Sequence, residues 1–130
     1  MLKSIECPYA HLHAQLDQGV LILSINRAEA KNALNMDLYI NLRQAICEAD
    51  QASEVRVLIL RGVDQDFSAG NDMQSFFQLP ELPQAGQAGS TPPFMLLKAT
   101  AEFSKPCIAA VRGACIGVAN TLLLHFDFVY

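Results

Sequence analysis

The sequence predicts an α/β fold in which short apolar strands alternate with helices. Three apolar runs, Val20–Ile25, Val55–Leu60 and Cys107–Val111, have the length and composition of strands buried in a parallel sheet. Between the first two, residues 36–51 repeat apolar side chains at three- and four-residue steps, as an amphipathic helix does. The 130 residues are enough for one domain, so we expect a single unit over residues 1–130.

The first half of the chain is expected to begin with a hairpin. His11–Leu16 alternates polar and apolar side chains, which indicates a half-exposed strand that pairs with Val20–Ile25 through a turn at residues 17–19. Asn35 is a good N-cap for a helix from Met36 to about Gln51. One face of that helix is apolar and comprises Leu38, Leu42, Ala45, Ile46 and Ala49. Arg61 and Gly62 are expected to end the next strand.

The second half continues the alternation of helices and strands. We expect a short helix over Asp72–Gln78, a mobile loop over Leu79–Pro93, which holds four of the six prolines, and a helix over Phe94–Phe103. A helix from about Gly117 to Leu124 and a strand from Phe126 to Tyr130 follow the third apolar run. A chain that stops inside a strand is expected to be part of a longer protein.

Composition excludes several classes of protein. With 52% hydrophobic residues the chain can form a core, so it is not intrinsically disordered. A net charge of −4 without a basic cluster argues against a nucleic-acid partner. The uncharged run Gly113–Phe126 is too short to span a membrane, and the N-terminus lacks the pattern of a signal peptide. The four cysteines lie far apart and are expected to be reduced thiols in a cytosol-like compartment.

Phe67–Met73 is the first stretch that suggests chemistry. Gly70 permits a backbone conformation that other residues avoid, and the helix expected after it would leave the Asn71 N–H without a helical partner. Such an N–H, at the positive end of a helix dipole, can hold a developing oxyanion, and Asp72 would stabilise the helix end. An ordinary glycine turn between a strand and a helix remains the alternative.

Arg112–Thr121 is the second stretch, with the small or short residues Gly117, Val118 and Ala119 again between a strand and a helix. Ligands bind at this edge of open α/β sheets, outside the carboxyl ends of the strands. A close-packed helix start would explain the same residues. Two backbone donors from two such turns make a two-donor oxyanion hole, which one turn alone cannot supply.

Other candidate residues carry weaker signals. Arg27 and Lys31, in the polar run Arg27–Asn35, are able to neutralise phosphates, although a solvated loop before a helix is the simpler interpretation. His11 and His13 would point to one face of a strand, but no further ligand has suitable spacing, so we expect no metal site.

These stretches together resemble the crotonase, or enoyl-CoA hydratase/isomerase, superfamily. The matching motifs are Asn-Ala-Leu-Asn at 32–35, Phe-Ser-Ala-Gly-Asn-Asp-Met at 67–73, Lys-Pro-Cys-Ile-Ala-Ala-Val-Arg-Gly at 105–113 and Phe-Asp-Phe-Val-Tyr at 126–130. Four motifs in order and spacing are more specific than any one of them. The resemblance implies repeated ββα units, truncated here before the C-terminal helical region, and a homotrimer or dimer of trimers in the complete protein.

The resemblance also implies acyl-CoA thioesters as substrates, with coenzyme A as part of the substrate and no separate cofactor. The N–H groups of Asn71 and Val118 would form the oxyanion hole for a thioester enolate. Residues implied to bind the CoA moiety or border the site are Ala28, Ala30, Lys31, Ala69, Gly70, Asp72, Met73, Gly117 and Thr121. Residues 28–31 would line the adenine and phosphate end, and residues 69–73 the pantetheine.

One departure from the family pattern indicates the reaction. Hydratases of the family carry a catalytic glutamate where this chain has Thr121, which cannot act as a carboxylate base. The chain instead resembles the peroxisomal-type Δ3,Δ2-enoyl-CoA isomerases of fatty acid oxidation, whose single glutamate lies in a later segment, past Tyr130. We therefore expect an isomerase-like protein whose 130-residue part has little turnover. Hydration or other acyl-CoA chemistry and a catalytically inactive acyl-CoA-binding relative remain alternatives, and the expected compartment is the cytoplasm, or the peroxisome in a eukaryote.

Overall fold

The computed structural model describes residues 3–78 and 86–130, and in these ranges six strands form one sheet in chain order. The first three strands pair antiparallel, while β3 to β6 pair parallel, as in a sheet built from strand–helix–strand crossovers. The strands are β1 (Lys3–Ile5), β2 (Leu12–Asp17), β3 (Val20–Ile25), β4 (Val57–Gly62), β5 (Cys107–Ala110) and β6 (Phe128–Val129).

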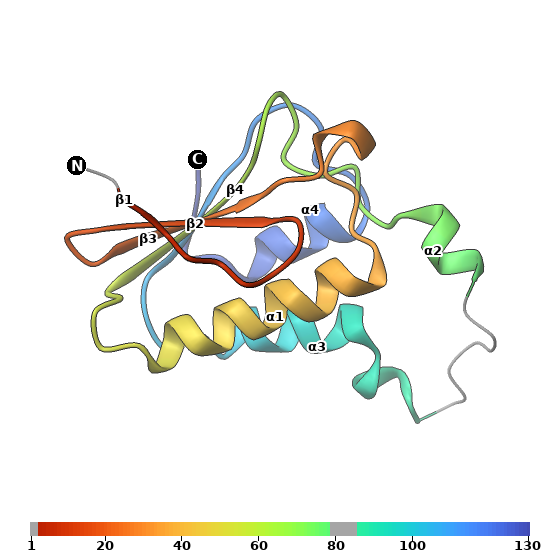
Figure 1. Cartoon of the computed structure of the whole chain (residues 1–130). Helices are drawn as coiled ribbons and strands as arrows, with labels where there is room; N and C mark the ends of the chain where they lie inside the picture. Colours follow the sequence, from red (N-terminus) through yellow and green to blue (C-terminus); the bar gives the residue numbers. More distant parts are fainter. Residues whose placement is uncertain (1–2, 79–85) are drawn as a thin grey trace.

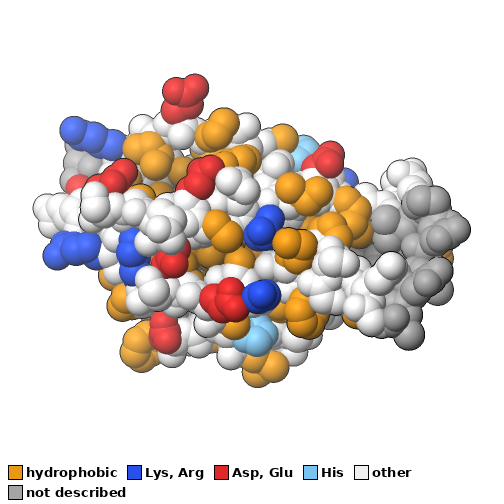
Figure 2. Space-filling model, turned by 90° about the horizontal axis from the view of Figure 1, so that it is seen from below, with side chains coloured by type: hydrophobic (Ala, Val, Ile, Leu, Met, Phe, Trp, Pro, Cys, Tyr) orange, Lys and Arg blue, Asp and Glu red, His pale blue; other side chains and the backbone are white. Residues whose placement is uncertain are grey.

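Helices cover one face of this sheet. The longer pair, α1 (Met36–Gln51) and α3 (Pro92–Ala101), lie side by side against it, while α2 (Met73–Phe77) projects from the body on the side away from the termini (Figure 1). The fourth helix, α4 (Val118–Leu122), continues into a 3₁₀ turn, η3 (Leu123–His125). Figure 2 looks onto the helical face, where apolar side chains lie among charged ones. Further 3₁₀ turns are η1 (Ala28–Ala30) and η2 (Ala88–Ser90).

The first helix forms as its sequence predicts. The Asn35 side chain accepts a hydrogen bond from the Leu38 N–H at 2.9 Å and so satisfies one of the unpaired donors of the first turn. All the residues of the predicted apolar face are buried: Leu38, Leu42, Ala45, Ile46 and Ala49. They pack on the sheet side chains that point toward the helices, which are Leu21, Leu23, Leu58, Leu60, Cys107 and Ala109.

The opposite face of the sheet corrects the expectation that these strands are covered on both sides. Ile22, Ile59 and Ile108 form one cross-strand row on this face, and all three are only half-buried. The residues beside them in each strand point to the helical face and are almost completely buried. In the described structure, one face of the sheet is therefore fully covered and the other is covered only in part.

The predicted order of elements is confirmed, and their boundaries differ in places. The fourth strand begins two residues later than expected and includes Arg61 and Gly62, because its ladder with β3 continues to the pair Ile25 and Gly62. The strand β1 was not predicted. The third helix starts at Pro92, inside the expected loop, because proline is well tolerated in the first turn of a helix; residues 79–85 of that loop lie outside the described residues. No helix in the described ranges is both long and apolar enough to cross a membrane.

Candidate active site

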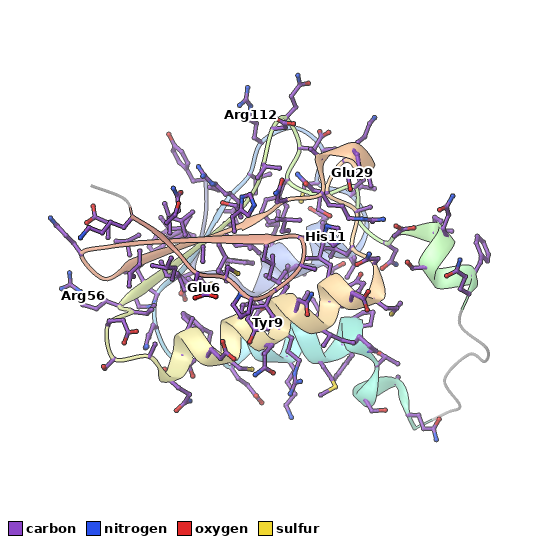
Figure 3. All side chains as sticks on the ribbon, in the orientation of Figure 1. Glu6, Tyr9, His11, Glu29, Arg56 and Arg112 are labelled. Atoms are coloured by element: carbon purple, nitrogen blue, oxygen red, sulfur yellow. The ribbon has the colours of Figure 1, made fainter. Side chains whose placement is uncertain are left out.

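Three loops meet where the parallel strands end. Residues 26–35 follow β3, residues 63–72 follow β4 and residues 111–117 follow β5, and we call them the first, second and third loops. Glu29 of the first loop and Arg112 of the third extend from this upper end of the molecule (Figure 3). The edge at the carboxyl ends of parallel strands is where open α/β sheets bind their ligands.

The second loop is hydrogen-bonded to both of its neighbours. On one side, the Ala69 N–H donates to the Lys31 carbonyl at 2.9 Å. On the other, the Ser68 N–H donates to the Ala114 carbonyl at 3.0 Å, and the Ile116 N–H donates to the Ser68 carbonyl at 3.1 Å. The loops that carry the predicted stretches 32–35, 67–73 and 112–121 are therefore adjacent in space.

Asn32 holds the first two loops together, and the sequence analysis did not identify that role. It is almost completely buried and adopts a positive φ of 56°. Its carboxamide accepts from the Arg27 N–H at 2.9 Å and donates to the carbonyls of Val63 at 2.9 Å and Asp66 at 2.7 Å. Asparagine is enriched at positive φ, so the Asn32 residue itself was the sequence feature that could have indicated this conformation.

Gly70 brings the second and third loops into direct backbone contact. Its φ is +84°, and a Cβ atom at this position would lie 2.5 Å from the Ile116 carbonyl oxygen. Only glycine combines that conformation with so close an approach. The contact places Asn71, which follows Gly70, next to the Ile116–Val118 segment.

The orientation of the Asn71 N–H follows from the hydrogen bond on the other side of its peptide. The Gly70 carbonyl accepts from the Leu34 N–H at 2.7 Å, and the peptide between Gly70 and Asn71 is trans. In a planar trans peptide the N–H points opposite to the carbonyl, so the Asn71 N–H points away from Leu34. Within residues 3–78 and 86–130 it has no hydrogen-bond acceptor.

The same reasoning applies to Val118. The Gly117 carbonyl points along α4 and accepts from the Thr121 N–H at 3.1 Å, so the Val118 N–H points out of the start of the helix. It too has no acceptor among the residues that the structure describes. Gly117 has φ +59°, and no atom of residues 3–78 or 86–130 lies within 4 Å of the position that a Cβ would take, which leaves space beside this amide.

The helices after these two amides are shorter than the sequence suggested. Both α2 and α4 have five residues, so few peptide dipoles align behind either amide. The donors are therefore the individual N–H groups, whose general direction follows from the hydrogen bonds of their own peptides.

Asp72 is engaged within the protein rather than free for a ligand. Its Oδ2 atom lies 2.6 Å from Nη1 of Arg27, and its Oδ1 atom caps α2 by accepting from the N–H groups of Gln74 and Ser75 at 3.0 and 3.3 Å. The hydrogen bond from Arg27, more than the others, holds the pKa of Asp72 below its usual value. The guanidinium of Arg27, one of the two groups able to neutralise a phosphate, binds Asp72 and the Ala33 carbonyl in this structure.

The remaining predicted residues lie around the same three loops. A hollow of about 330 Å³ is lined by Ala28, Lys31, Asn32 and residues 63–66. Lys31 is exposed beside it, whereas Ala30 is partly buried. Met73 is 57% exposed on α2, and Thr121 is exposed with its hydroxyl 3.4 Å from the Gly117 carbonyl.

The histidine pair is not arranged as the sequence suggested. His11 precedes β2 with φ 63°, so it does not share a strand face with His13, whose Nε2 atom lies 2.8 Å from Nδ2 of Asn26. In the described part of the chain no three His, Cys, Asp or Glu side chains cluster as a metal site would require. The four cysteines are all unpaired.

Comparison with known proteins identifies the family of this chain. The Enoyl-CoA hydratase/isomerase family model matches residues 15–130. A crystal structure from Acinetobacter baumannii, assigned as an enoyl-CoA hydratase/isomerase, superposes with a TM-score of 0.88 at 53% identity, covering 93% of this chain and 49% of that one.

Curated relatives carry the names of different enzymes. Enoyl-CoA delta isomerase 2 of Homo sapiens is 30% identical over 118 residues, covering 88% of this chain and 29% of the relative. The 2,3-dehydroadipyl-CoA hydratase of Escherichia coli is 34% identical over 112 residues, covering 86% of this chain and 42% of the hydratase. The chain thus spans less than half the length of these proteins. With the family model matched over most of its residues, the chain belongs to the enoyl-CoA hydratase/isomerase family.

Proposed function

We propose that this chain binds acyl-CoA thioesters and that the N–H groups of Asn71 and Val118 donate to the thioester oxygen. The observation that carries the proposal is the pair of outward-pointing amides, without acceptors in the described structure, on two loops in backbone contact. Donors fixed in advance stabilise an oxyanion well because they need not reorganise as charge develops.

The reaction proposed for the complete protein is the Δ3 to Δ2 double-bond shift. A base removes a proton from C2 of a 3-enoyl-CoA, the negative charge spreads through a dienolate to the thioester oxygen, and a proton returns at C4. Asn71 and Val118 stabilise that oxygen. The base would be the glutamate that the family resemblance places past Tyr130, since Thr121 stands at the position used by hydratases.

The CoA moiety would extend along the first and second loops. The adenine and phosphate end would lie at the hollow beside Ala28 and Lys31, where an exposed ammonium group can attract phosphate. The pantetheine would run along residues 69–73 toward the two amides. The acyl group would then be near Met73, the exposed apolar residue that follows. A homotrimer of the complete protein remains part of this proposal.

Binding without catalysis is the second candidate for the 130-residue chain. The second loop carries three carboxylates. Asp72 binds Arg27, Asp66 accepts from the Ala114 N–H at 2.8 Å, and Asp64 is exposed at the hollow beside Ala28 and Lys31. The two carboxylates nearer to Asn71 are thus engaged, which favours a chain that binds thioesters with little turnover.

Calorimetry with a matched pair of ligands tests the proposal. Octanoyl-CoA has a thioester carbonyl, and S-octyl-CoA is the thioether that lacks this oxygen but keeps the CoA and the alkyl chain. We expect the thioester to bind about three- to tenfold more tightly, as one or two hydrogen bonds would allow. Equal affinities would contradict the assignment of the two amides, and absence of binding by both ligands would contradict acyl-CoA binding itself.

A further inference from the structure

Tyr39 of α1 contacts Asn71 of the second loop. It lies in the first turn of α1 with a completely buried side chain, and its hydroxyl donates a hydrogen bond to Oδ1 of Asn71. The two residues are 32 positions apart, and Asn71 itself is exposed. A buried phenol thus reaches the surface residue whose N–H is the first proposed oxyanion donor.

One backbone hydrogen bond holds each peptide beside Asn71. Leu34 donates to the Gly70 carbonyl at 2.7 Å and accepts from the Asp72 N–H at 2.9 Å. Arg27 holds the Asp72 side chain. A peptide held at one atom can still tilt about that bond, and in the described structure the hydrogen bond from Tyr39 to the Asn71 side chain is the further contact that limits this tilt.

We infer that Tyr39 is a positioning residue: its hydroxyl holds the Asn71 carboxamide and so keeps the Asn71 N–H aimed at the thioester oxygen. The inference rests on the proposed function of that N–H. Burial raises the pKa of Tyr39 above its usual range, so the phenol stays protonated and able to donate at neutral pH.

The variant Tyr39→Phe distinguishes a positioning role of the hydroxyl from a purely structural one. Tyr39→Phe keeps the buried ring and removes only the oxygen, and water can replace that oxygen at Asn71 because Asn71 is exposed. The variant should then fold with a stability close to that of the parent. A structural role would lower the Tm of the variant and leave the enolate fraction of a bound ligand unchanged. A positioning role would leave the Tm unchanged and lower that enolate fraction.

Acetoacetyl-CoA is a suitable probe because its enolate absorbs in the near ultraviolet and needs no catalytic base to form. An oxyanion hole raises the enolate fraction of the bound ligand at a given pH. We expect Tyr39→Phe to lower that equilibrium about three- to tenfold, the range of one hydrogen bond, while the Kd from calorimetry changes less than twofold.

Two further variants make the test specific. Asn71→Ala breaks the same contact from the surface side, so it should lower the enolate equilibrium similarly, and the double variant should lose no more than either single one. Tyr9→Phe is the matched control. Tyr9 lies over α1 and donates to Glu48 at 2.5 Å, away from the second loop (Figure 3), and its loss should leave the enolate equilibrium unchanged.

The outcomes separate this inference from the proposed function. If the parent chain stabilises the enolate and both Tyr39→Phe and Asn71→Ala do so equally well, the role of Tyr39 is refuted and the oxyanion hole stands. If the parent chain binds acetoacetyl-CoA without enriching its enolate, the oxyanion hole fails, and the role of Tyr39 fails with it. If Tyr39→Phe does not fold, Asn71→Ala alone decides the outcome.

Discussion

Gly70 packs so closely on Ile116 that a Cβ atom on Gly70 would lie 2.5 Å from the Ile116 carbonyl oxygen. This contact joins the second and third loops immediately before Asn71 and Val118. The distance between the two loops that carry the proposed donors is therefore set by backbone packing.

Gly70→Ala is expected to lower the free energy of unfolding by about 2–4 kcal/mol, because the new Cβ meets a carbonyl oxygen and φ is positive. Gly86→Ala is the matched control: φ is +94° and no atom of the described residues lies within 4 Å of the new Cβ, so only the conformational cost of about 1–2 kcal/mol applies. Urea denaturation measures both. Equal losses for the two variants would show that the contact with Ile116 is not tight in solution.

The ion pair between Arg27 and Asp72 predicts a pH-dependent contribution to stability. Arg27 lowers the pKa of Asp72 in the folded chain, so the pair's contribution is fully present above the unfolded pKa of about 3.9 and is lost as the pH falls through the lower folded value. Asp72→Asn keeps a good capping residue and removes the charge. The difference in unfolding free energy between the parent and this variant should be constant above about pH 5 and shrink below about pH 4. A difference that stays flat into the acid range would refute the pairing.

Lys31 is expected to contribute to CoA affinity through the phosphates. Lys31→Ala should weaken octanoyl-CoA binding about threefold at low salt and less at high salt, because exposed charges are screened. Lys98→Ala is the control, since Lys98 is an exposed lysine of α3 whose nearest charge is Glu102 at 3.8 Å. Calorimetry at two ionic strengths compares them. Identical affinities for both variants would place the phosphates elsewhere.

Steady isomerase turnover is not expected from the 130-residue chain. A 3-enoyl-CoA incubated with it should show no formation of the conjugated 2-enoyl product above background. On the second loop Asp66 and Asp72 are engaged and Asp64 lies at the hollow proposed for the adenine and phosphate end, and Thr121 is not a base. Ultraviolet absorbance of the conjugated thioester follows the reaction. A rate proportional to protein concentration that persists through repurification would contradict this expectation.

Much of the fold follows from local sequence patterns. The strand Val20–Ile25 and the helix Met36–Gln51 occur where their periodicity predicts, because each pattern is long and one face is buried. The strand Lys3–Ile5 could not be predicted in this way, since all three residues are exposed and it exists only by pairing with β2. The end of β4 was misplaced because its register depends on β3, far away in the chain.

The sequence identified the loops of the candidate site but not their internal contacts. The motif at 67–73 indicated an unpaired N–H at Asn71, yet its direction depends on the hydrogen bond from Leu34 to the Gly70 carbonyl, which joins residues 36 positions apart. The pairing of Arg27 with Asp72 and that of Tyr39 with Asn71 likewise join distant positions. Local patterns carry no information on such pairs, which is why the sequence did not indicate that Arg27 binds Asp72.

Polarisation of the bound thioester carbonyl tests the central claim most directly. Val118→Pro deletes one proposed donor at the first position of α4, where proline is tolerated, whereas Val118→Ala keeps the N–H and only shortens the side chain. An isotope-edited infrared difference spectrum of bound octanoyl-CoA should show the carbonyl stretch below its frequency in water for the parent and for Val118→Ala, with a smaller downshift for Val118→Pro. An unshifted stretch in the parent, or an equal downshift in the proline variant, would contradict the two-amide oxyanion hole.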